Sequence, residues 1–188
     1  MGGSPLAGSG GAGPRLYVGV VGSAACDPHV AALAEEVGRL LAEAGAVLVC
    51  GGRGGVMEAA SRGAAEAGGL VVGILPDEDR LGANPHLTVS VPTGLGQARN
   101  ALVALSSHAV IAISGGYGTL SEIGHALKLG VPVVGLKTWE LLMDGRPDPA
   151  ILRAESPSEA VELALRATRP PGRGGASGGR KGGGPVAP

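Results

Sequence analysis

Short apolar runs alternate with longer amphipathic stretches along the middle of the chain. Six apolar runs have the length of strands: residues 16–21, 46–50, 70–75, 87–91, 108–113 and 131–135. Five stretches predict helices: residues 30–44, 56–67, 97–106, 119–129 and 156–168. The strands are continuous apolar runs rather than alternating ones, which is typical of strands buried on both faces.

The alternation of strands and helices predicts an α/β fold. We expect a doubly wound, Rossmann-like parallel sheet of six to seven strands flanked by helices, in a single domain over residues 15–168. The chain has 188 residues, which suits one domain. It has no Phe and one Trp, so Val, Leu, Ile and Ala must form the core.

Both ends of the chain differ in composition from this middle part. Residues 1–14 are rich in Gly, Ala, Ser and Pro, and residues 169–188 are richer still in Gly and Pro. Such segments bury too little apolar surface to offset the entropy lost on ordering. We therefore predict a disordered segment at each end of one folded domain.

Charge and cysteine usage exclude several classes of protein. The net charge is -1, so no general attraction to nucleic acid or to an anionic membrane is expected. Cys26 and Cys50 lie far apart, without a CxxC pair, which argues against a disulfide scaffold or a metal site.

No stretch has the length and apolar character of a bilayer span, and the N-terminus does not resemble a secretory signal. We expect a cytoplasmic protein without a membrane partner.

Glycine-rich turns follow several of the predicted strands. They are Gly22-Ser23, Gly51–Gly55, Thr93-Gly94 and Gly115–Gly118. Because the carboxyl ends of parallel strands share one edge of a sheet, these turns should converge there. Glycine lets backbone N–H groups point together, and a following helix N-terminus favours an anion. The pattern predicts a phosphate site, although a single turn of this kind can need glycine for tight turning alone. No GxxxxGK[ST] loop and no complete GxGxxG fingerprint is present.

Two charged residues beside these turns are candidates for chemistry. Glu122 lies one helical turn beyond Gly118, where a carboxylate could act on a bound ligand. Thr119 and Glu122 also fit a capping box, in which Glu122 would only hold the helix start. Arg99 follows another strand end, and a surface arginine is the alternative. The ring of Tyr117 could stack on a base or pack at a dimer edge.

The stretch from Ser114 to Glu122, SGGYGTLSE, resembles the PGGxGTxxE motif of the LOG family of phosphoribohydrolases. The segment from Gly51 to Met57, GGRGGVM, is similar to that family's earlier glycine loop. The resemblance covers residues 16–136. It implies Arg99 and Glu122 as catalytic residues in hydrolysis of a nucleoside 5′-monophosphate to base and ribose 5-phosphate. The strand-end turns and the resemblance together predict these ligand contacts: Gly22, Ser23, Gly51, Gly52, Arg53, Gly54, Gly55, Met57, Thr93, Gly94, Ser114, Gly115, Gly116, Tyr117, Gly118 and Thr119.

Three departures from the LOG pattern point to a sister branch. Ser114 replaces the motif's Pro, Asn100 stands where the enzymes have Lys after Arg99, and Arg53 interrupts the earlier glycines. The branch with these features includes the molybdenum cofactor carrier proteins, which bind a phosphate-bearing pterin without turnover. Two functions therefore stay open: a hydrolase, and a carrier or sensor of a nucleotide or molybdenum cofactor. Neither requires a further cofactor.

The resemblance also bears on assembly and on an older label of the family. It implies a homodimer or homotetramer with a small nucleotide-like ligand as partner. Many family members are labelled lysine decarboxylases, but pyridoxal phosphate chemistry needs a lysine for its Schiff base. The chain has only Lys128, Lys137 and Lys181, and of these only Lys137, which follows the sixth predicted strand, is a candidate, without supporting context. The sequence thus argues against a decarboxylase.

Overall fold

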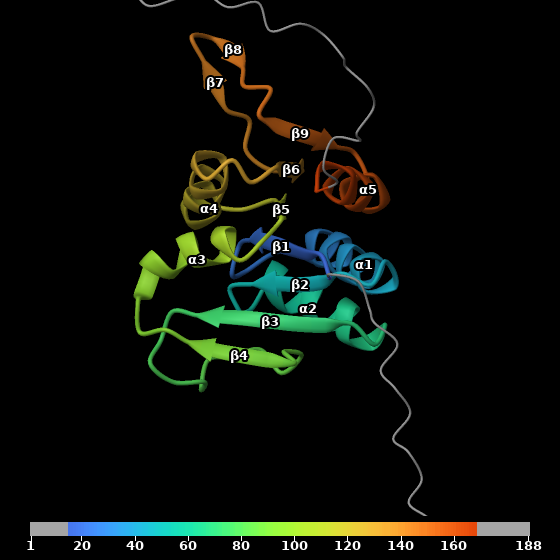
Figure 1. Ribbon diagram of the computed structural model, residues 1–188, viewed down its shortest axis with the longest axis vertical. Helices are drawn as coiled ribbons and strands as arrows, with labels where there is room; N and C mark the ends of the chain where they lie inside the picture. Colours follow the sequence, from blue (N-terminus) through green and yellow to red (C-terminus); the bar gives the residue numbers. More distant parts are fainter. Residues whose placement is uncertain (1–14, 169–188) are drawn as a thin grey trace, which may run out of the picture.

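Seven parallel strands form the centre of the fold in the computed structural model, which describes residues 15–168 (Figure 1). Their order across the sheet is β4-β3-β2-β1-β5-β6-β9, and every neighbouring pair is parallel. The strands are β1 (Tyr17–Gly22), β2 (Val47–Cys50), β3 (Leu70–Leu75), β4 (Val89–Pro92), β5 (Ala109–Ile113), β6 (Val133–Leu136) and β9 (Ile151–Ala154). The doubly wound α/β fold predicted from the sequence is confirmed. The disorder predicted for residues 1–14 and 169–188 lies outside the described residues.

Five α-helices cover the two faces of the sheet. They are α1 (Pro28–Glu43), α2 (Val56–Glu66), α3 (Asn100–Leu105), α4 (Tyr117–Lys128) and α5 (Pro157–Ala167), with a 3₁₀ turn, η1 (Gly96–Arg99), directly before α3. Helices α1, α2 and α5 pack on one face, around buried residues such as Val37, Leu41 and Ile111. Helices α3 and α4 pack on the other face, around Val103, Ile123 and Val110.

The first helix pair packs at very close range because glycines lie in the contact. A Cβ atom on Gly38 of α1 would lie 1.9 Å from the carbonyl oxygen of Ala60 in α2. One on Gly63 of α2 would lie 2.0 Å from the carbonyl oxygen of Glu35 in α1. The backbones of the two helices thus touch, and only glycine allows this approach.

The crossover direction of the chain changes between β1 and β5, which are neighbours at the centre of the sheet. Strands β2, β3 and β4 lie on one side of this pair, and β6 and β9 lie on the other. In open α/β sheets such a switch point leaves a crevice beyond the carboxyl ends of the strands. The β1–α1 and β5–α4 turns meet at this crevice.

The segment after β6 contains structure that the sequence patterns did not predict. Strands β7 (Leu142–Met143) and β8 (Arg146–Pro147) form a two-stranded antiparallel hairpin that stands away from the main sheet in Figure 1. Asp144 and Gly145 turn this hairpin with φ angles of 52° and 74°. Strand β9 follows and adds the seventh strand at the edge beside β6.

Candidate functional site

A cavity of about 410 Å³ lies beyond the carboxyl ends of the central strands. Its lining comes from the turns after β1, β2, β3 and β5 and from η1, α2, α3 and α4. The lining residues are Gly22, Ser23, Ala24, Arg53, Met57, Pro76, Gln97, Arg99, Asn100, Gly116, Gly118, Thr119 and Glu122. Both predicted catalytic residues and seven of the predicted ligand contacts are therefore brought together at one site.

The first turn of α4 supplies the backbone groups that an anion needs. Gly116 is the N-cap of this 12-residue helix, and Gly116, Gly118 and Thr119 line the cavity. The first N–H groups of a helix have no partner within the helix and carry a partial positive charge. A phosphate in this part of the cavity would receive those N–H donors.

The other nine predicted contacts do not line the cavity, and three of them pack against residues that do. Gly51 lies directly beneath the Arg99 side chain, since a Cβ atom there would be 2.1 Å from Arg99 Nη1. Gly55, with a φ of 63°, lets the chain pass against the carbonyl of Ser23. Gly115 packs on Thr119. Gly52, Gly54, Thr93, Gly94, Ser114 and Tyr117 are also absent from the lining.

Arg99 and Glu122 form a buried ion pair at the inner wall of the cavity. Arg99 is 7% exposed and Glu122 is 5% exposed. Arg99 Nη1 donates to Glu122 Oε1 across 3.4 Å, a long contact for two opposite charges. Arg99 Nε is buried and has no hydrogen-bond partner among residues 15–168. Both charges therefore keep capacity for a ligand.

Burial changes the acid–base properties of this pair. Loss of solvation raises the pKa of Glu122 from 4.5 to about 7, and attraction to Arg99 opposes that rise. Burial also lowers the pKa of Arg99, while the charge of Glu122 raises it again. A carboxyl group that titrates near neutral pH can give or take a proton at physiological pH.

The helix start excludes the capping box considered for Glu122. Helix α4 begins at Tyr117 rather than at residue 119, so Thr119 is inside the helix and not at its N-cap. Glu122 lies six residues beyond the N-cap Gly116 and contacts Arg99 instead. Arg99 is likewise not a surface residue, because the short η1–α3 segment turns it inward.

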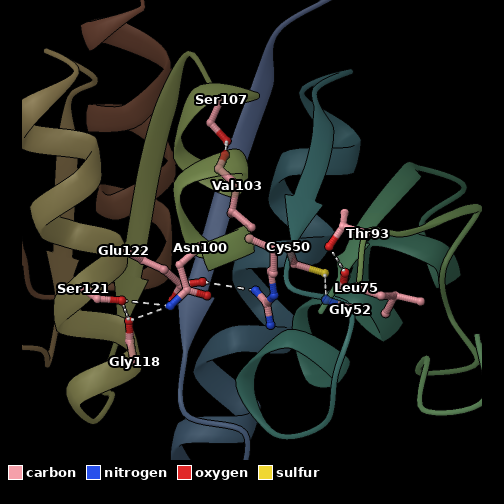
Figure 2. Close-up of polar contacts among 11 residues, drawn as sticks. Cys50, Gly52, Leu75, Thr93, Asn100, Val103, Ser107, Gly118, Ser121 and Glu122 are labelled. Atoms are coloured by element: carbon pink, nitrogen blue, oxygen red, sulfur yellow. Dashed lines mark hydrogen bonds and ion pairs between the residues drawn. The ribbon is translucent and has the colours of Figure 1, made fainter. Parts of the chain in front are cut away.

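Asn100 uses its amide to join α3 to α4. Its Nδ2 donates to Ser121 Oγ at 2.8 Å and to the carbonyl oxygen of Gly118 at 3.5 Å (Figure 2). Ser121 Oγ in turn donates to the same carbonyl at 2.7 Å. Asn100 is 4% exposed, so a neutral side chain occupies this part of the wall. Among the charged residues in the lining, only Arg99 is beside Glu122.

A second arginine faces the cavity from its outer wall. Arg53 lines the cavity, but its guanidinium forms an ion pair with Asp77 and donates to the carbonyl oxygen of Gly82 at 3.4 Å. About a third of the Arg53 side chain is exposed. Asp77 and Gly82 belong to the loop between β3 and β4. This arginine is therefore held away from the centre of the cavity.

Two predicted residues near α4 lie at the back of the turn. Ser114 has a φ of 52°, its N–H donates to the carbonyl oxygen of Leu136, and its own carbonyl accepts from Thr138. Tyr117 is 82% exposed, and its ring centroid lies 5.7 Å from that of Trp139. Neither side chain lines the cavity.

Four lining residues were not among the predicted contacts: Ala24, Pro76, Gln97 and Asn100. Ala24 directly follows the Gly22-Ser23 turn, and Pro76 directly follows β3, so their position after a strand could have predicted their place in the lining.

Lys137 lies outside the lining, with Nζ 3.0 Å from His29 Nε2. Within residues 15–168, no three His, Cys, Asp or Glu side chains are grouped as metal ligands would be. In the same residues no helix has the length and apolar character needed to cross a bilayer.

Comparison with known proteins gives matches over nearly the whole folded part. The model of the SLOG cluster4 family matches residues 15–161. An uncharacterised protein of Archaeoglobus fulgidus is 43% identical over 151 residues, which are 80% of this chain and 95% of that protein.

Solved structures with clear sequence similarity include two proteins that bind the molybdenum cofactor. The molybdenum cofactor binding protein of Rippkaea orientalis superposes with a TM-score of 0.75 at 37% identity, over 82% of this chain and 98% of that one. The molybdenum cofactor carrier protein of Chlamydomonas reinhardtii gives 0.68 at 31% identity, with the same coverage of both chains. DNA processing protein A of Helicobacter pylori gives 0.63, but at 21% identity it shares only the fold.

Proposed function

The chain belongs to the SLOG cluster4 family, and from this premise we propose that it binds a phosphate-bearing ligand, a nucleotide or a molybdenum cofactor, and retains it without turnover. The observation that carries this proposal is the cavity at the switch point of the sheet. It combines the open N-terminus of α4 with two arginines, Arg53 and Arg99. The similar proteins of Rippkaea and Chlamydomonas are named for molybdenum cofactor binding and carriage, which supports the same ligand class here.

The proposed binding mode assigns a part of the ligand to each wall. The phosphate lies at the N–H groups of Gly116, Gly118 and Thr119. Arg99 contacts a second polar group of the ligand through its outer nitrogen atoms. Such charge-assisted hydrogen bonds are stronger than neutral ones, particularly where water is excluded. Ser23 and Gln97 complete the polar lining.

A second candidate is hydrolysis of a nucleoside 5′-monophosphate, and Glu122 is the observation that favours it. In that reaction water adds to C1′ of the ribose, and the N-glycosidic bond breaks with its electron pair going to the base, which takes up a proton. A carboxylate beside C1′ would stabilise the developing positive charge. Glu122 lines the cavity, and burial raises its pKa to about 7, a value that suits a residue that transfers protons.

The same proposal includes assembly and location. We propose a homodimer or homotetramer in the cytosol. An apolar surface on the α3 side of the sheet supports a second copy, because Val72, Ile74, Val91 and Leu102 line an open hollow there. Leu105 beside it is 66% exposed. The molar mass measured by light scattering tests the assembly, and a monomeric mass would contradict it.

The experiment that separates the two functions follows ligand and product together. Purified protein is incubated with nucleoside monophosphates or with molybdenum cofactor and then passed through a desalting column. We expect the wild type and Glu122→Gln to retain cofactor, with no free base released from any monophosphate. Release of base by the wild type, lost by about 100-fold or more in Glu122→Gln, would establish the hydrolase instead. Failure of every ligand to bind would overturn both functions.

A further inference from the structure

The two arginines of the cavity differ in how firmly they are held. Arg99 is buried and lies in a fixed position between Gly51 and Glu122. Arg53 and its partner Asp77 keep a third or more of their side chains exposed. An exposed ion pair of this kind shifts an equilibrium by up to about fivefold. Arg53 can therefore exchange one anionic partner for another at little cost.

The backbone of Arg53 is anchored, so only its side chain is free to turn. The N–H of Asn84 donates to the carbonyl oxygen of Gly52 at 2.9 Å, and Asn84 Nδ2 donates to that of Arg53 at 3.2 Å. Asn84 is itself buried. These contacts hold the β2–α2 turn against the β3–β4 loop whether or not the guanidinium contacts Asp77.

Position in the sheet sets what Arg53 could reach. Arg53 follows β2 and the α4 turn follows β5, with β1 between these two strands. Neighbouring strands are about 4.8 Å apart, so the two turns are about 10 Å apart. A phosphate at the α4 N-terminus covers part of that distance. A second anionic group attached to it would lie within reach of a turned arginine side chain.

We propose that Asp77 competes with the ligand for Arg53, and that the site therefore selects ligands carrying two anionic groups, such as a diphosphate. This inference rests on the proposed phosphate site at α4. The second anionic group displaces the Asp77 carboxylate from Arg53, and Asp77 is left to water. A ligand with one phosphate leaves the Arg53–Asp77 ion pair intact and gains no contact with Arg53.

Affinities for AMP and ADP, measured by titration calorimetry, test this inference. We expect the wild type to bind ADP about tenfold more tightly than AMP, since one charge-assisted contact is added. Asp77→Asn frees Arg53 and should tighten ADP binding by a further factor of about three while AMP changes less than twofold. Arg53→Gln should remove the preference for ADP, and Asp77→Asn should have no effect in that background.

Glu78→Gln is the matched control, because this neighbouring carboxyl group lies beside Gly94 and forms no ion pair with Arg53. It should leave both affinities unchanged. Phosphate and pyrophosphate repeat the comparison without a base, and thermal melts confirm folding. Asp77→Ala replaces Asp77→Asn if the latter unfolds. Equal affinity for AMP and ADP, or an Asp77→Asn protein that binds ADP no better, overturns this inference alone. No binding of any of the four probes to the wild type overturns the proposed phosphate site as well.

Discussion

The contact between α1 and α2 and the inner wall of the cavity both depend on glycines that have no room for a Cβ atom. At Gly38 the space is filled by the backbone of another helix, at the carbonyl of Ala60. At Gly51 it is filled by the guanidinium of Arg99. The first glycine lets two helices touch, while the second makes room for a charged side chain that lines the cavity.

Burial has different consequences in the two regions. The inner part of the contact between α1 and α2 is apolar, with the partly exposed Glu35–Arg62 ion pair at its edge, so burial of the inner part stabilises the folded state. The wall of the cavity buries Arg99 and Glu122 with a long contact and an unpartnered Nε. Burying charges with incomplete pairing costs free energy. The comparison indicates that the helix pair maintains the fold and that the cavity wall gives up some stability for binding.

The largest expected effect is at the helix contact. In Gly38→Ala the new methyl group would lie 1.9 Å from a backbone oxygen, so the helices must separate. We expect the free energy of unfolding to fall by about 3 kcal/mol, as for severe overpacking, in urea denaturation. Gly124→Ala in α4 is the control, since its Cβ would meet open space and alanine favours a helix. A loss below about 1 kcal/mol for Gly38→Ala would show that α1 and α2 can move apart at little cost in free energy.

The next effect is a dependence of stability on pH that comes from Glu122. Its pKa is about 7 in the folded protein and 4.5 ordinarily, so between these values the folded state holds a proton that the unfolded chain has released. Its contribution to the free energy of unfolding is therefore present below pH 4.5 and is lost as pH rises through 7. Relative to Glu122→Gln, the wild type should lose up to about 3 kcal/mol between pH 4.5 and 8. Parallel pH profiles for the two proteins would contradict the raised pKa.

The smallest effect on stability is expected at Gly51. In Gly51→Ala the methyl group meets the end of a side chain rather than backbone, so Arg99 can move aside. We expect a loss of about 1 kcal/mol in stability and a loss of about tenfold in ligand affinity. Gly38→Ala should show the reverse, with unchanged affinity in the protein that remains folded. If both variants lose affinity equally, the two regions are not separate in function.

The central strands and most helices could be predicted because their apolar runs are long and continuous. Strand β9 could not, because Arg153 lies in its middle and only four residues pair at the sheet edge. The hairpin did leave a signal, since an Asp-Gly pair such as Asp144-Gly145 favours a two-residue turn. Its strands of two residues each are too short to show a pattern.

The site was predictable in its position and only partly in its geometry. Glycine turns on one edge of a parallel sheet indicated where Arg99 and Glu122 would meet. Their burial could not be deduced, because it depends on η1 turning Arg99 over Gly51. The ion pair between Arg53 and Asp77 could not be predicted from the sequence either, because it depends on how the β3–β4 loop folds against the β2–α2 turn.

Ser114 distinguishes the turn between β5 and α4 from the corresponding turn of the LOG motif. The resembling LOG motif has proline at this position, and proline is restricted to a φ near −65° and has no N–H. Here φ is 52°, and the N–H donates to Leu136. One substitution to proline would break both features at once, and the loop would have to change its path before it could accept the new residue. The residue at position 114 therefore serves as a sequence marker of the loop conformation, because serine is compatible with the positive φ and proline requires a different path.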